Sequence, residues 1–89
     1  MTIKVTAAHI LTGKKNNCFD CPVSLAAKEA FSADSTVVRG TKLSVYYNDP
    51  FSLKFYDLPL NVVGTYMHFD KTGQMEPFEF KVNNENTSN

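Results

Sequence analysis

Cysteine is scarce in this 89-residue sequence, tryptophan is absent, and neither sign of charge prevails. Two cysteines are too few for the disulfide framework of a small secreted protein, which needs roughly four to eight. Nine basic side chains balance nine acidic ones. This balance argues against bulk electrostatic attachment to nucleic acid, and equally against an acidic mimic of DNA. No apolar run approaches the ~20 residues that span a bilayer.

The sequence also lacks a basic N-terminal segment followed by an apolar run, so it predicts no signal peptide. We therefore expect an intracellular protein with reduced thiols. The length predicts a single domain over residues 1–82, with a stability of only about 5–10 kcal/mol. Residues 83–89 contain no apolar side chain, and we expect them to form a disordered C-terminal tail.

Two segments have the pattern of main helices, and one shorter segment has the pattern of a helical turn. Pro22 suits the first position of a helix that runs to Phe31, with Cys21 as its cap. Leu58-Pro59 opens a second helix, again with proline in the first turn, which runs to about Lys71 and is ended by Gly73. Thr6 is expected to cap the short turn. Strands are predicted where apolar and polar residues alternate, over residues 2–6, 36–38, 41–47, 51–56 and 78–82.

These elements predict an α+β fold: a small, mainly antiparallel sheet of four to five strands with two main helices packed on one face. Period-two and helical spacing then predict which side chains face the core. On the strands the predicted inward residues are Leu43, Val45, Tyr47, Phe51, Leu53, Phe55, Phe78, Phe80 and Val82. On the helices they are Val23, Ala26, Ala27, Ala30, Phe31, Leu60, Val63 and Met67, with Ser24 outside the apolar face. Val62, Tyr66 and Phe69 broaden the apolar surface of the second helix, which predicts that this helix is covered on more than one side.

Cys18 and Cys21 form a C-x-x-C pair with three interpretations. A zinc site needs four ligands, so both cysteines would have to meet His9 and His68, the only histidines. A redox site would use the helix dipole to lower a thiol pKa, which the neighbouring Asp20 would oppose. The favoured interpretation is structural, with both thiols reduced, free of metal and packed so that they fasten the loop to the sheet.

Signatures of catalysis are missing from the sequence. It has no Gly-rich phosphate loop, no nucleophile elbow and no deaminase signature, because proline follows the second cysteine and no H-x-E occurs. A nucleophilic cysteine could be paired with His9 or His68, but the sequence offers no group that would orient the histidine. We therefore predict a protein that is not an enzyme and needs no cofactor.

Aromatic residues gather between positions 46 and 56. If both strands keep their alternation, Tyr46 and Tyr56 point away from the helices, beside Lys42, Ser44 and Lys54. Tyrosines next to cations are typical of protein interfaces, and they also suit base stacking. We predict a protein-binding surface made of Tyr46, Tyr56, Lys42 and Lys54, which could also join two copies of the chain.

Several short motifs together resemble a family of small uncharacterised proteins encoded by bacteriophages and prophages. They cover most of residues 3–82: His9-Ile10-x-x-Gly13, Cys18-x-x-Cys21-Pro22-Val23-x-Leu25-Ala26, Leu58-Pro59, Phe69-Asp70-x-x-Gly73 and Pro77-Phe78-x-Phe80. The resemblance implies a phage gene product working in the host cytoplasm, and it transfers no functional residue.

The resulting expectation is a non-enzymatic phage protein that binds and modulates a host or phage protein, such as an inhibitor of host machinery or defence. The expected partner is a protein, with a homodimer as a further possibility and with nucleic acid and membrane disfavoured. The alternative from another class is a small zinc-stabilised or nucleic-acid-binding module, and a thiol enzyme is the third.

Overall fold

A computed structural model describes residues 1–82, which form three helices and five strands. The predicted tail over residues 83–89 lies outside the described residues. The helices are α1 (Ala7–Thr12), α2 (Pro22–Phe31) and α3 (Leu60–Thr72). The strands are β1 (Thr2–Val5), β2 (Ser35–Arg39), β3 (Lys42–Asn48), β4 (Phe51–Asp57) and β5 (Phe78–Lys81). No helix within residues 1–82 is both long and apolar enough to cross a membrane.

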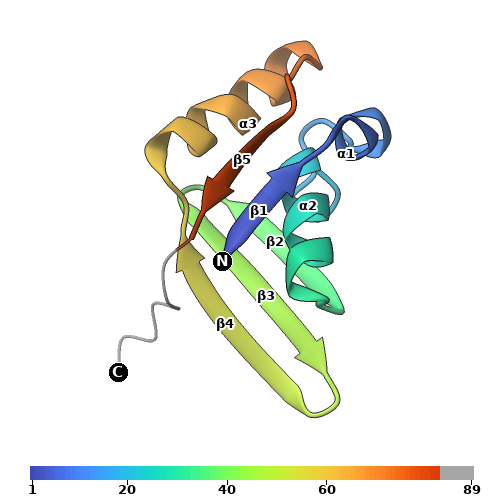
Figure 1. Ribbon diagram of the computed structural model, residues 1–89, viewed down its shortest axis with the longest axis vertical. Coiled ribbons are helices and arrows are strands. Elements are labelled where there is room, and N and C mark those ends of the chain that lie inside the picture. The colour runs from blue at the N-terminus through green and yellow to red at the C-terminus, as the bar shows by residue number, and fades with distance from the viewer. Residues whose placement is uncertain (83–89) are drawn as a thin grey trace.

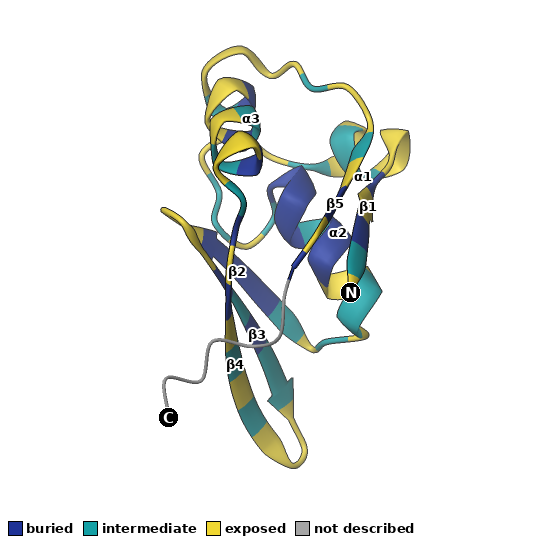
Figure 2. Cartoon of the chain, turned by 60° about the vertical axis from the view of Figure 1, so that its left-hand side comes forward, coloured by how far each residue is buried: buried dark blue, intermediate teal, exposed yellow. Residues whose placement is uncertain are grey.

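The strands form two antiparallel sheets, and this arrangement confirms the predicted α+β class. One sheet has the order β2-β3-β4, and the other pairs β1 with β5 (Figure 1). Helix α2 contacts β1, β2 and β3, so it packs against both sheets. The helix therefore occupies the middle layer, with a sheet on either side of it (Figure 2).

The sequence around Cys21 accounts for the start of α2. Cys21 is the N-cap residue and its Sγ accepts the Ser24 N–H at 3.4 Å, while Pro22 takes the first turn. Along the helix, Val23, Ala26 and Ala27 are buried. Small side chains let the helix approach both sheets closely, whereas the alanine spacing predicted a single narrow face against one sheet.

Ser24 was expected outside the apolar face of α2, and this expectation is wrong because Ser24 is fully buried. Its hydroxyl lies 3.0 Å from the Thr36 carbonyl oxygen and 2.8 Å from the Thr36 hydroxyl. The Thr36 hydroxyl in turn donates to the Ser24 carbonyl at 2.7 Å. Buried polar groups need partners, and these two hydroxyls satisfy each other while tying α2 to β2.

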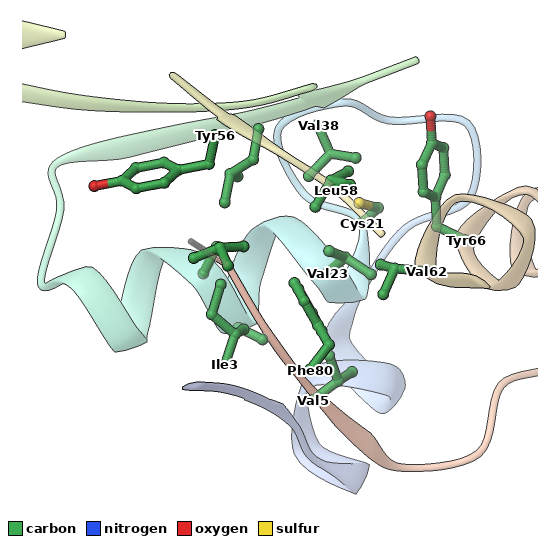
Figure 3. Packing of buried hydrophobic residues seen from close by; sticks show 14 of the residues in the cluster. Ile3, Val5, Cys21, Val23, Val38, Tyr56, Leu58, Val62, Tyr66 and Phe80 are labelled. Atoms are coloured by element: carbon green, nitrogen blue, oxygen red, sulfur yellow. The ribbon is translucent and has the colours of Figure 1, made fainter. Parts of the chain in front are cut away.

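The two-stranded sheet closes the other side of the core. Ile3 pairs with Phe80 and Val5 with Phe78 across β1 and β5. Phe80 and the following Val82 are buried, and Phe78 packs against the same cluster. The predicted inward orientation of this last strand is confirmed. Figure 3 shows Val38 and Tyr56 on one side of α2 and Ile3, Val5 and Phe80 on the other.

Helix α3 follows Pro59 and ends at Gly73, whose φ of 76° is a left-handed conformation suited to glycine. Its buried residues are Val62, Tyr66 and Phe69. The predicted inward residues Leu60 and Met67 are exposed, so this part of the expectation is wrong, whereas the residues expected to broaden the apolar surface are the buried ones. The helix offers two apolar stripes of similar spacing, and the stripe with the two aromatic rings buries more surface.

The orientation of β4 also differs from the expectation. Tyr56 was predicted to face outward, but it is buried and its ring lies 4.9 Å from that of Phe31. The predicted inward residues Phe51, Leu53 and Phe55 are exposed. The more apolar of the two alternate sets of β4 is thus the exposed one, whereas the inward set, Ser52, Lys54 and Tyr56, contains a single aromatic side chain. Pairing with β3, rather than the apolar pattern of β4 alone, decides which set faces the core.

Phe80→Ala should lower the free energy of unfolding by about 3–5 kcal/mol, because it empties a buried position between β1 and α2. The matched control is Phe51→Ala, which removes the same atoms from an exposed site and should change it by about 0.5 kcal/mol or less. Urea unfolding followed by circular dichroism measures both variants. Equal losses would contradict the described layer order.

Candidate functional site

The face of the β2-β3-β4 sheet turned away from α2, here called the outer face, carries an ordered set of side chains. Cross-strand pairing places them in rows. One row is charged: Asp57, Lys42 and Arg39. The next two are mainly apolar: Phe55, Ser44 and Val37, then Leu53, Tyr46 and Ser35. Phe51 lies opposite Asn48 at the hairpin end.

The outer face exposes large apolar side chains. Phe51 is 71 % exposed, Phe55 44 % and Leu53 36 %, and Phe19 from the preceding loop is 56 % exposed. These include every exposed phenylalanine within residues 1–82. Single exposed apolar residues are ordinary, whereas adjacent ones mark interaction surfaces. The far end of the β3–β4 hairpin also extends past α2 (Figure 2).

A groove of about 400 Å³ crosses this face. Val37, which is nearly buried, lies between more exposed side chains and forms the floor of the groove. The groove has apolar and aromatic walls and two cations at one end. Its lining residues are Phe19, Val37, Arg39, Lys42, Ser44, Tyr46 and Phe55.

The C-x-x-C loop holds Phe19 at this groove. The Asn17 Oδ1 accepts the Phe19 N–H at 3.0 Å and the Asp20 N–H at 2.9 Å. The Val38 N–H donates to the Cys18 carbonyl at 2.9 Å. These bonds fasten the loop along the open edge of β2, which is the structural role that the sequence favoured for the cysteine segment.

The charged row carries an excess of positive charge. Lys42 forms an ion pair with Asp57, and both side chains are largely exposed. Arg39 lies directly opposite Lys42 on the neighbouring strand. The part of the chain that the structure describes contains no ion pair of Arg39. Like charges directly opposite each other on a sheet are mildly destabilising, so this end of the groove favours an anion.

The structure brings only part of the predicted binding surface together on one face of the sheet. Lys42 and Tyr46, with Ser44, share the outer face. Tyr56 pairs with Leu43 and Lys54 with Val45, which places both on the opposite face of the sheet. The sequence analysis missed the larger part of the site, which consists of Phe19, Val37, Arg39, Phe51, Leu53 and Phe55.

A usable signal for the missing residues was the turn between β3 and β4. Asn48 pairs with Phe51, so only Asp49 and Pro50 connect the strands. With a connection of that length, paired residues have one odd and one even number, and paired residues share a face. Tyr46 and Tyr56 therefore cannot face the same side.

The potential metal ligands are not brought together. The Nδ1 of His9 accepts the Thr6 N–H at 3.0 Å, so its Nε2 carries the proton and donates to Glu29 Oε1 at 2.5 Å. His68 is exposed on α3. Within residues 1–82 no three His, Cys, Asp or Glu side chains form a group that could hold a metal ion.

Both thiols are free of a disulfide bond. Burial raises the pKa of Cys21 from 9.0 to about 11, and the Asp70 carboxylate and Cys18 add to this shift. Asp20 was expected to raise the thiol pKa, whereas desolvation by burial is the larger cause of the shift. A thiol with this pKa stays protonated near neutral pH and is a poor nucleophile.

A larger hollow, of about 620 Å³, lies between α3 and the segment before β5. Its lining is mixed and includes His68, Glu76 and Phe78. It is widely open, whereas small-molecule sites are concave pockets that bury most of the ligand surface. The outer face is therefore the better candidate.

Comparison with known proteins identifies no relative: no family model, curated protein or solved structure matches the chain. The resemblance to the phage family stays a prediction.

Cys21 should make stability fall in alkaline solution. The folded chain binds the thiol proton more tightly than the unfolded chain, so the free energy of unfolding should decline as pH rises from 9.0 to about 11. The full loss is about 2–3 kcal/mol. Cys21→Ser should remove this part of the decline, and Tyr66→Phe separates the contribution of Tyr66, whose pKa burial also raises. A wild-type decline that persists in Cys21→Ser would contradict the assignment.

Proposed function

We propose that this chain is a non-enzymatic binding protein that attaches to a partner protein through the outer face of its three-stranded sheet. We further propose, from the sequence resemblance, that it is phage-encoded and acts in the host cytoplasm to modulate a host or phage protein.

The single observation that carries the binding proposal is the contiguous apolar surface formed by Phe51, Leu53 and Phe55 beside Phe19. Complete burial of an exposed Leu or Phe side chain contributes about 1.5–3 kcal/mol, and each of these four residues can contribute the share that corresponds to its exposed surface. The four residues, flanked by Tyr46 and Arg39, have the composition of a protein-interface centre, where aromatic residues and arginine are enriched.

The same face suits a protein better than a nucleic acid. Aromatic rings on a sheet can stack on bases, but strand binders also need a row of cations along the backbone path. Here Lys42 is already paired with Asp57, and the whole chain is electrically neutral. Arg39 alone adds a net positive charge to the charged row.

A binding role also fits the state of the nucleophilic and basic side chains. Cys21 is buried with a raised pKa. The His9 ring caps α1 through Thr6 and bonds Glu29, so both of its nitrogens already have partners. These contacts give the thiol and the imidazole structural roles, which supports a non-enzymatic protein.

Phe55→Asp should abolish partner binding, because it places a charge in the middle of the apolar rows. The test compares tagged wild-type protein with this variant in affinity purification from phage-infected bacterial cells, followed by mass spectrometry. The captured partner is then purified, and its dissociation constant should rise by at least about tenfold for Phe55→Asp.

The matched control is Leu60→Asp, which makes the same kind of change at an 80 % exposed position on α3. It should retain the partner at wild-type affinity. Circular dichroism confirms that both variants are folded. If the two variants bind the purified partner equally well, the interface lies elsewhere and the proposal is wrong.

A further inference from the structure

We infer that the groove on the outer face recognises an extended segment of the partner that carries a carboxylate two residues from a large apolar side chain. This inference rests on the proposed function and names the chemistry of the partner at that same site.

The carboxylate is assigned from the charged row. Arg39 and Lys42 lie opposite each other, and Asp57 neutralises only one of the two cations. A partner carboxylate beside Arg39 would remove this imbalance, and the planar guanidinium can hold it with two parallel hydrogen bonds. A basic partner segment would add a third positive charge at the same end of the groove.

The apolar anchor is assigned from the adjacent row. Val37 is the floor of the groove, and Phe19, Phe55 and Tyr46 stand around it. A side chain inserted there would exchange exposed aromatic surface for buried contacts, which are the contacts that dominate interface energies.

Sheet geometry sets the spacing between the two groups. Arg39 and Val37 are two residues apart on β2, a separation of about 7 Å along a strand. In an extended partner segment, residues two apart also point to the same side with nearly the same separation. An Asp or Glu two positions from a Phe, Tyr, Leu or Ile therefore matches the site.

The experiment selects binders from a library of random peptides displayed on filamentous phage, using the purified full-length chain. The enriched peptides should contain an Asp or Glu two positions from a large apolar residue. A synthetic peptide of that sequence should bind at least about tenfold more weakly to Arg39→Glu. It should keep its affinity for Lys81→Glu, which makes the same charge change at an exposed position of β5.

The outcomes separate this inference from the function on which it rests. If the enriched peptides lack acidic residues, or bind Arg39→Glu as well as wild type, the assigned chemistry is wrong. The proposed interface still stands in that case, provided that Phe55→Asp abolishes binding.

If no peptide depends on Phe55, both proposals fail. If a poly(dT) strand of about 20 nucleotides binds more tightly than the peptides and is released steeply by salt, the ligand is nucleic acid and both are overturned.

Discussion

The buried hydroxyl pair of Ser24 and Thr36 fixes how helix α2 lies on the three-stranded sheet. Each hydroxyl lies within hydrogen-bonding distance of the other residue's backbone carbonyl, so neither hydroxyl is buried without a partner. Within residues 1–82 no other buried side-chain nitrogen or oxygen lacks a hydrogen-bond partner either. Leaving one partner buried without the other would cost about 1–3 kcal/mol. These bonds hold one turn of α2 against β2, on the inner face of the sheet that also carries the buried Val38, Leu43 and Tyr56.

The position of α2 explains why the opposite face is left uncovered. The helix contacts strands of both sheets, and its small residues allow the two sheets to share one core. A chain of this length has few elements with which to cover a second face of the sheet, and small domains bury only a modest share of their surface. Among the described elements, α1 contacts α2, and α3 buries Val62 and Tyr66 in the common core. The outer face thus keeps its aromatic rows exposed, and the loop before α2 adds Phe19 to them.

Much of the local structure was predictable from the sequence. The local signals are proline at the first position of α2, the Thr6 cap of α1 and the glycine after α3. Each helix forms where these signals predict a helix. The inward side of β5 was predictable as well, because only one of its alternate sets is apolar. These signals act through residues that are close in the sequence. In this chain the tertiary contacts leave the local structure that they predict unchanged.

The candidate site was predicted less well, because it depends on choices that the local apolar pattern does not decide correctly. On strand β4 the more apolar alternate set, Phe51, Leu53 and Phe55, is the exposed one, and α3 has two apolar stripes. Pairing with β3 and the burial of two aromatic rings settle these choices, and both are tertiary effects. Tyr46 and Lys42 were placed correctly on the outer face, while Tyr56 belongs to the core. Phe19 and Arg39 also line the site. Their segments come close to the groove only in the folded chain, and no local sequence pattern predicts this.

The central claim is that the outer face of the three-stranded sheet is the binding surface. The most direct measurement is nuclear magnetic resonance of the ¹⁵N-labelled full-length chain, titrated with its purified partner. The account predicts that shifted or broadened amide signals cluster at Phe19, Val37, Ser44, Tyr46 and Phe55. The amides of β1 and of the exposed side of α3 should stay unchanged. A cluster of shifts at the hollow around His68 and Glu76, with the outer face unaffected, would contradict the account.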